Sequence, residues 1–418
     1  MIKHSYSISP LVDPTYGIIK EFLHIPNYPN NPRVWVTIAQ GSSYNTAGFS
    51  ASGAGISKSD AMLSAMGEYV ERYCSLQNHT PLTYEKYNFE SNKINPSLFD
   101  KFEKTNSPFK KYNNDVISWI KGKDLKNNEE VKIPAQAAYL TYIEGLPDEK
   151  FWMTNSTGVA CSPTLDGAIW RGLAECFERD AIQTMWQNQI SIPKIDYLKN
   201  KELSDFYYEY IHSKGITFYL YEFKMDWDIP AVFGIAEIEN GGIVAAAAVR
   251  STWQDACKKT LVELAQSLVG YAPLLYKGDY PQYSDDYMDV KSYDDHSMLY
   301  FHPKMKKFLS FLLDTEEYTL IPETECVLDD QEFIQYMIEQ ANKIDKSMYW
   351  VDLTLPEIKE HGWYVVRTLI PGLADIEPGY KYQFINERVL EIPQKLIELG
   401  KRKPEHFNGK PITPHPFP

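Results

Sequence analysis

Three windows of this chain share one layout, and this repetition limits the possible folds more than any other property of the sequence. They cover residues 57–71, 164–178 and 252–266. Each begins with Ser or Thr, has Ala four positions on, Glu seven positions after that, and Glu or Gln three positions further. Ser and Thr are preferred N-cap residues, because their hydroxyl accepts a hydrogen bond from an unpaired amide of the first turn. The sequence therefore predicts three helices that start in the same way.

A stretch rich in small residues lies ahead of each window, at 47–56, 154–163 and 241–250. Such stretches suit strands or turns at which the backbone closely approaches another element or a ligand. The repeated unit is therefore predicted to be a strand, a small-residue turn and a helix. Repetition of this unit within 418 residues indicates one large α+β body in which mixed sheets pack with helices.

The net charge and the cysteines narrow the range of partners and compartments. The chain has 42 Lys and Arg against 56 Asp and Glu, a formal net charge of -14, which repels nucleic acid and anionic membranes. Its five cysteines include no C-x-x-C pair, so they indicate neither a disulfide framework nor a zinc ribbon and fit a reducing compartment. No apolar run reaches the length of a spanning helix. The sequence predicts a cytoplasmic protein without nucleic-acid or membrane partners.

The end of each window places two acidic or amide side chains on one helical face, because they are three positions apart. The pairs are Glu68 and Glu71, Glu175 and Glu178, and Glu263 and Gln266. Arg72 and Arg179 follow the first glutamate of two pairs at i+4, so each helix alone also fits an ordinary solvated face with ion pairs. If the three helices converge, their carboxylates require divalent cations, and oxygen donors favour Mg²⁺ that bridges to phosphate. The chain has no G-x-x-x-x-G-K-[ST] motif, which excludes a P-loop as the nucleotide site.

At these residues the sequence resembles the YcaO family. Residues 64–72, SAMGEYVER, match its S-x-x-x-E-x-x-E-R motif, and residues 155–181 are similar to its second motif, centred on E-x-x-E-R-D. VELAQ at 262–266 matches its third motif, E-x-x-Q, and the stretches 294–301 and 351–373 also agree. The resemblance spans roughly residues 45 to 418, and three linked motifs make it specific. It implies an ATP-binding fold unrelated to P-loop and kinase folds.

The resemblance implies a role for each matching residue. Mg²⁺ would bind to the carboxylates of Glu68, Glu71, Glu175 and Glu178. ATP would contact Ser64, Asn155, Ser156, Arg179, Arg250, Glu263 and Gln266, with Arg250 included for its position just before the third helix. Many family members read G-K-G where this chain has Gly53, Ala54 and Gly55. A basic residue near the nucleotide is therefore either missing or supplied by Lys58.

The stretch PITPHPFP at 411–418 allows two interpretations. By composition alone it is a disordered polyproline tail. Pro414, Pro416 and Pro418, however, form a P-x-P-x-P ending similar to that of the azoline-forming branch of the family, where it implies a C-terminus threaded into the active site. Proline stiffness would hold such a tail at low entropic cost. The Pro418 carboxylate, together with Arg179, would then act in catalysis.

The resemblance implies ATP-dependent cyclodehydration of Cys, Ser or Thr in a ribosomally made precursor peptide, which yields thiazoline or (methyl)oxazoline. The expected partners are that peptide and a separate E1-like subunit that binds its leader. A flavin-dependent azoline dehydrogenase and a second copy of the chain are further candidates. Thioamide formation on a peptide backbone and a non-catalytic nucleotide-binding scaffold stay open as alternatives.

The same resemblance suggests how the chain is divided. We expect an N-terminal edge or interface segment at 1–44, an ATP-binding catalytic domain at 45–410 and the tail at 411–418. The Tyr- and Asp-rich stretch at 278–295 is predicted to be a solvated insertion loop rather than a partner surface. His296 matches a family motif, but we expect a structural histidine with satisfied hydrogen bonds and assign it no role.

Overall fold

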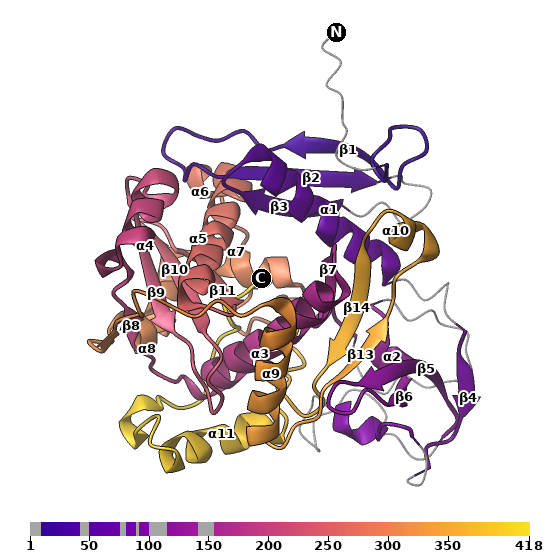
Figure 1. The fold of residues 1–418 in the computed structure, drawn as a ribbon. Coiled ribbons are helices and arrows are strands. Elements are labelled where there is room, and N and C mark those ends of the chain that lie inside the picture. The colour runs from indigo at the N-terminus through magenta and orange to yellow at the C-terminus, as the bar shows by residue number, and fades with distance from the viewer. Residues whose placement is uncertain (1–9, 42–49, 76–80, 89–91, 100–114, 141–153) are drawn as a thin grey trace.

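The computed structural model describes residues 10–41, 50–75, 81–88, 92–99, 115–140 and 154–418, and the described strands form three sheets (Figure 1). The first has the order β1-β2-β3 and consists of β1 (Ile19–His24), β2 (Trp35–Gly41) and β3 (Ser50–Gly55). The second has the order β11-β10-β9-β8-β12 and consists of β8 (Lys194–Ile195), β9 (Ile216–Glu222), β10 (Ala231–Ile238), β11 (Ile243–Val249) and β12 (Tyr318–Thr319). The third has the order β4-β5-β13-β14-β7, with β6 paired to β5, and consists of β4 (Thr83–Glu85), β5 (Ile117–Asp124), β6 (Glu130–Pro134), β7 (Val159–Ser162), β13 (Tyr349–Asp352) and β14 (Tyr364–Leu369).

The three predicted helices are present and begin as the sequence indicates. They are α1 (Lys58–Cys74), α3 (Leu165–Asn188) and α5 (Trp253–Gly270). The cap hydroxyls of Ser57, Thr164 and Thr252 each accept a hydrogen bond from the amide three residues on, at 3.1, 3.0 and 3.1 Å. Because β3, β7 and β11 directly precede these helices, the repeated strand-turn-helix unit is confirmed, and with it the α+β class.

Small residues let the repeated helices pack closely against the strands. In the strand orders above, β3, β7 and β11 each stand at one end of a sheet. A Cβ added at Gly53 of β3 would lie 2.2 Å from the Ala65 amide of α1. A Cβ added at Gly172 of α3 would lie 2.6 Å from the carbonyl oxygen of Gly158, just before β7. Each repeated helix is therefore positioned at the end of a different sheet, and the three surround the centre of the molecule (Figure 1).

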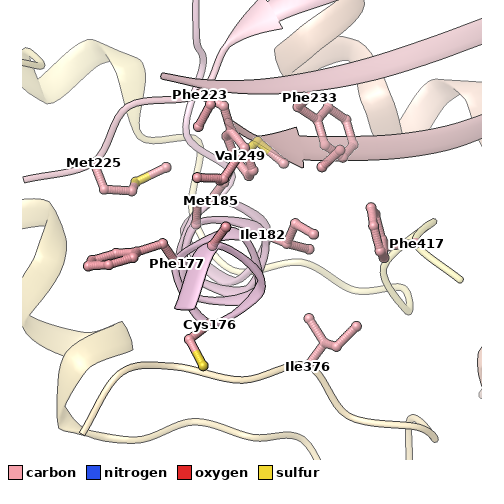
Figure 2. Close-up of a cluster of buried hydrophobic side chains, with 14 of the residues drawn as sticks. Cys176, Phe177, Ile182, Met185, Phe223, Met225, Phe233, Val249, Ile376 and Phe417 are labelled. Carbon is pink, nitrogen blue, oxygen red and sulfur yellow. The ribbon is translucent and has the colours of Figure 1, made fainter. Parts of the chain in front are cut away.

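The central helix α3 is buried on almost all sides. Its side chains Phe177 and Trp186 belong to a large core cluster. Figure 2 shows Phe177 of this cluster together with Phe223, just after β9, and Phe233 of β10. Helix α11 (Glu387–Glu398) is tied to this core by Arg388. Its guanidinium Nη2 lies 2.8 Å from the buried carboxylate of Asp180 in α3. A helix held this firmly gives the acidic residues in its middle fixed positions.

The remaining described helices are short or lie at the periphery. They are α2 (Ala135–Ala138), α4 (Lys201–Phe206), α6 (Ala272–Lys277), α7 (Tyr293–Leu299), α8 (Ser310–Leu313), α9 (Asp330–Lys343) and α10 (Pro356–Glu360). The prediction of a loop at 278–295 is wrong for its last residues, because Ser292 caps α7 and residues 293–295 form its first turn. Within the described part of the chain, no helix combines the length and apolarity needed to cross a membrane.

Strand β2 pairs with β1 on one side and with β3 on the other, so the strands within residues 19–41 belong to the same sheet as the first repeated unit. The expected boundary at residue 44 falls in 42–49, outside the described residues. The division into segments stays a prediction.

Candidate active site

A cavity of about 1230 Å³ lies where α1, α3 and α5 meet. This volume exceeds the roughly 300–1,000 Å³ of an ordinary small-molecule pocket, so the cavity can hold a nucleotide and part of a second substrate. Small residues of β3, β7 and β11 form other parts of its wall. The sequence-predicted residues that line it are Ser64, Glu68, Glu71, Ser156, Glu175, Glu178, Arg179, Arg250, Glu263, Gln266 and Pro418.

The acidic pair on α1 occupies two different environments. Arg72 donates two hydrogen bonds to Glu68 Oε1, from Nε at 2.8 Å and from Nη2 at 2.6 Å. Glu71 Oε1 instead accepts a hydrogen bond from the Cys161 amide of β7 at 2.9 Å. Burial and then the charge of Glu68 raise the pKa of Glu71 well above its ordinary value, and Glu175 of α3 adds to the shift. The carboxylates of α1 and α3 therefore lie close enough to repel each other.

The acidic pair on α3 shares one arginine. Arg179 Nη2 lies 3.1 Å from Glu175 Oε1, and Nη1 lies 3.2 Å from Glu178 Oε1 in an ion pair without hydrogen-bond geometry. Glu175 Oε2 also accepts the Gly158 amide at 2.9 Å. Burial raises the pKa of Glu178 to about 8, and Glu263 of α5 adds to the shift although Arg179 opposes it. Burial alone would lower the pKa of the Arg179 guanidinium. The negative charges of Glu178 and Glu175 outweigh this effect and raise the pKa.

The third window contributes polar groups from α5. Glu263 Oε1 forms an ion pair with Lys259 Nζ at 3.0 Å. Gln266 Nε2 donates to the Ser52 hydroxyl of β3 at 3.0 Å, so α5 is bridged to the strand before α1. The end of each window thus faces the same cavity, as the converging arrangement requires.

Arginine and lysine side chains line the cavity beyond those predicted. Arg171 and Lys259 are both in its wall, whereas Lys58, the expected substitute for the lysine of G-K-G, is exposed and is not among the described lining residues. The guanidinium carbons of Arg171 and Arg250 lie 4.3 and 5.7 Å from the ring centroid of Trp170. Burial and then the charge of Arg250 lower the pKa of Arg171, as expected for two cations that face one space. The suggestion of Lys58 is therefore wrong, and Arg171, Arg250 and Lys259 supply the positive charge.

Asn155 does not reach the described cavity wall. It is 5% exposed, and its Nδ2 donates to Asp375 Oδ2 at 2.7 Å. The Thr157 hydroxyl donates to the other oxygen of Asp375 at 2.8 Å, and Arg367 Nη1 donates to the Asn155 carbonyl at 2.6 Å. Asn155 therefore shapes the turn that carries Ser156 and Thr157 into the cavity wall. Asp375 lies 220 positions after Asn155, so the sequence around Asn155 does not reveal this hydrogen-bond partner.

The predicted metal ligands are paired with protein groups. Among the described residues, no group of three or more His, Cys, Asp or Glu is arranged as a metal-binding cluster. The carboxylates instead contact arginines and backbone amides. Their chemistry nevertheless fits Mg²⁺, which prefers oxygen donors, and the raised pKa values of Glu71 and Glu178 show that the surrounding protein groups do not by themselves favour the charged carboxylates. The assignment of these residues as ligands stays a prediction.

The C-terminal tail reaches the same cavity. Phe417 and Pro418 line it, and the Arg179 guanidinium carbon lies 4.5 Å from the centroid of the Phe417 ring. Figure 2 shows Phe417 beside α3 with Ile182 and Ile376, which belong to the same core cluster. Phe417 was not among the sequence candidates. A cation held against an aromatic face is stabilised by the ring, so the tail takes part in positioning Arg179.

The chain matches the family model described as YcaO cyclodehydratase, ATP- and Mg²⁺-binding, over residues 52–374. A curated relative, an uncharacterized protein of Methanothermobacter thermautotrophicus, is 24% identical over 186 residues, which cover 44% of this chain and 47% of that protein. The match thus spans about half the length of the curated relative.

Several solved structures share the fold. A heterocyclase in complex with substrate and cofactor is similar with a TM-score of 0.78 at 20% identity, over 97% of this chain and 56% of that chain. The YcaO protein of Methanopyrus kandleri, bound with AMPPCP and Mg²⁺, has a TM-score of 0.60 at 18% identity, over 85% and 86%. The E. coli microcin synthetase McbBCD complex has a TM-score of 0.61 at 19% identity, over 94% and 96%. At these identities the similarity concerns the fold.

Proposed function

The chain belongs to the YcaO family, and from that premise we propose that it is an ATP- and Mg²⁺-dependent cyclodehydratase. Its substrate would be a peptide in which Cys, Ser or Thr residues are converted to azolines. The observation that carries this proposal is the convergence of the acidic faces of three helices and of the C-terminal tail on one cavity of about 1230 Å³. The heterocyclase of similar fold, described in complex with substrate and cofactor, supports it.

Mg²⁺ would be held by Glu68, Glu71, Glu175 and Glu178. Two of these carboxylates, the half-buried Glu71 and the buried Glu178, have raised pKa values, so a nearby divalent cation would favour their charged form. Bound Mg²⁺ would supply bridges to phosphate oxygens and neutralise their charge. Glu68 and Glu175 already face arginines, and these cations would remain beside the phosphates.

ATP would be held by groups from each repeated unit. Ser64, Ser156, Glu263 and Gln266 line the cavity and offer hydrogen-bond donors and acceptors. Arg171 and Arg250 carry no carboxylate partner in the described ion pairs, and both face the cavity. They would bind phosphate oxygens in place of the lysine that Ala54 replaces. Asn155 would act through the turn it shapes.

The reaction would combine ring closure with phosphoryl transfer. The thiol or hydroxyl of the peptide would attack the preceding carbonyl carbon, and the former carbonyl oxygen would accept the γ-phosphoryl group of ATP. This oxygen would then leave as phosphate, so the peptide would lose one water in total. Arg179, held by two carboxylates and the Phe417 ring, would neutralise negative charge on the transferred group. Pro418 lines the cavity and would orient the peptide.

The partners we propose are the precursor peptide and an E1-like subunit that presents it. The microcin synthetase complex of similar fold, described in one structure with a pro-peptide bound, supports a multi-subunit assembly. A flavin-dependent azoline dehydrogenase would act after this chain.

Mass spectrometry of a Cys-, Ser- and Thr-rich peptide, incubated with the chain, the partner subunit and Mg-ATP, tests the proposal. We expect loss of one water mass per modified residue. Glu68→Gln should abolish this loss, whereas Glu391→Gln, at an exposed position of α11, should leave it unchanged. An unmodified peptide in the presence of a functional partner would exclude cyclodehydration. An oxygen-for-sulfur mass gain with a sulfur donor would instead identify a thioamide-forming enzyme.

A further inference from the structure

The tail crosses the centre of the molecule, and its path is fixed by hydrogen bonds (Figure 1). Thr413 and His415 are 1% and 0% exposed. Trp186 Nε1 of α3 donates to the Thr413 carbonyl at 3.2 Å, and the Tyr300 hydroxyl donates to the Pro414 carbonyl at 2.7 Å. A polyproline segment has few donors of its own, so the surrounding side chains supply them.

Two buried histidines meet at the middle of this path. The rings of His296, in α7, and His415, in the tail, stack with centroids 3.8 Å apart and an interplanar angle of 11°. Both residues are 0% exposed. We call this pair the histidine latch. It was not foreseen from the sequence, from which His296 was expected to be a satisfied structural residue.

The hydrogen bonds assign one neutral tautomer to each ring. His296 Nδ1 lies 2.9 Å from the His415 carbonyl oxygen, which only accepts, so Nδ1 carries the proton. Its Nε2 is buried and has no hydrogen-bond partner among the described residues, which corrects the expectation of satisfied bonds. His415 Nδ1 accepts the Phe417 amide at 3.3 Å, so its proton is on Nε2, which donates to the Glu377 carbonyl at 3.2 Å.

We propose that His296 and His415 are positioning residues that hold the tail at the cavity only while both rings are neutral. This inference rests on the proposed function, because the latch lies two residues before Phe417, whose ring contacts Arg179. A proton added to His296 Nε2 would place a buried N–H where no residue of the described chain offers an acceptor. A proton added to His415 Nδ1 would remove the acceptor of the Phe417 amide. Either event releases the segment that positions Arg179.

The charges around the latch favour the neutral state. Burial lowers the pKa of His296 to about 4, although Asp295 opposes this shift. Burial, then His296, and also Arg179 lower the pKa of His415 well below its ordinary value. The Glu377 carboxyl is itself buried, and burial raises its pKa to about 7, so it provides limited compensation for a cation. Its contact with the latch is through the backbone carbonyl.

The sign of the pH dependence follows from these directions. We call the tail held at the cavity the closed state. When the tail is released, each histidine regains its ordinary pKa of about 6.5 and binds a proton more readily than in the closed state. The closed state is therefore fully favoured above pH 6.5 and weakens as the pH falls towards 4. Each histidine weakens it about tenfold per pH unit below 6.5, so the pair weakens it about a hundredfold at pH 5.5.

Hydrogen exchange of the full chain, followed by mass spectrometry of the peptide that covers 411–418, tests the latch. Rates corrected for intrinsic pH dependence report the opening equilibrium. We expect about a hundredfold loss of protection in the wild-type chain between pH 7.5 and pH 5.5. His296→Asn keeps a donor for the His415 carbonyl, and His296→Phe keeps the stacked ring. Neither can be protonated, so each should reduce the loss to about tenfold.

His361→Asn, at an exposed position after α10, is the matched control and should behave as the wild-type chain. A tail whose protection is independent of pH, or is lost equally in wild type and both His296 variants, would overturn the latch. Exchange requires neither ATP nor peptide. A tail that opens with acid in a chain that never forms azolines would therefore refute the proposed function and leave the latch standing.

Discussion

Replacement of Glu178 by Gln should stabilise the metal-free protein while it weakens the binding of Mg-ATP. Burial raises the pKa of this carboxyl from 4.5 to about 8. The folded state therefore holds the proton more tightly than the unfolded state, and stability falls as the pH rises from 4.5 towards 8. At pH 7 this shift costs the wild-type chain about 3 kcal/mol, and at pH 5 less than about 1 kcal/mol, since one pKa unit corresponds to about 1.4 kcal/mol. A neutral amide avoids the cost.

The effect is measurable by thermal unfolding in EDTA at pH 5 and pH 7. An unfolding entropy of about 2.1 cal/mol/K per residue predicts that Glu178→Gln raises Tm by about 3 °C at pH 7 and by about 1 °C or less at pH 5. With Mg-ATP at a hundredfold excess over Kd the difference in stability should shrink, because the wild type gains about 2.7 kcal/mol, which offsets most of its cost of about 3 kcal/mol, and the variant gains less. Glu391→Gln should show neither effect. A variant that is no more stable than wild type at pH 7, or equally stabilised at both pH values, would refute the reasoning.

Three further changes test the packing that positions the cavity. Gly172→Ala should lower the free energy of unfolding by about 1–3 kcal/mol, because its Cβ would lie 2.6 Å from the Gly158 carbonyl oxygen. Gly67→Ala should raise it by about 0.5–1 kcal/mol, because no atom of the described residues lies within 4 Å of the added Cβ. The denaturant midpoints of the two variants measure both effects. Arg388→Met should cost about 3–5 kcal/mol in the same assay, because it removes the cation paired with the buried Asp180 and leaves the buried Asp226 with Lys395 alone. Phe417→Leu should keep the fold and reduce azoline formation at least tenfold, as measured by mass spectrometry, and an unchanged rate would exclude the role of the ring contact.

Two acids of the cavity destabilise the folded protein when no ligand is bound. Glu71 and Glu178 both have raised pKa values, and each faces a carboxylate from another helix. Such groups destabilise a protein unless a cation compensates them. We expect Mg-ATP to provide the compensation, so ligand binding and stability should be coupled at neutral pH.

Much of the acidic site could be predicted because its signals are local. Ser57, Thr164 and Thr252 mark helix starts by a rule that depends on three or four adjacent residues. The i, i+3 spacing of Glu68 and Glu71 places both on one helical face without reference to the rest of the chain. The same spacing rule places Arg171 on the face of Glu175, since it precedes Glu175 by one helical turn.

The environment of each of these residues depended on tertiary contacts. Asn155 reads as a nucleotide contact in the sequence, yet Asp375, 220 positions later, takes its amide. The spacing of residues along the sequence likewise does not indicate which lysine or arginine replaces the lysine that is absent at Ala54. Arg171 and Lys259 reach the cavity from different helices. The charge of the cavity therefore depends on which helices and strands the tertiary structure brings around it.

The sequence by itself determined the repeated strand-turn-helix unit, the caps of its helices and the acidic faces, because these follow from spacing along a short stretch of backbone. The tertiary structure decided that the three units stand at the ends of three different sheets, that Glu71 and Glu178 are cavity acids with raised pKa values, and that the tail contacts α3 and α7. It also brought His296 against His415, 119 positions apart. Such contacts arise only when distant segments share one interior, where burial and neighbouring charges set the protonation state of each group.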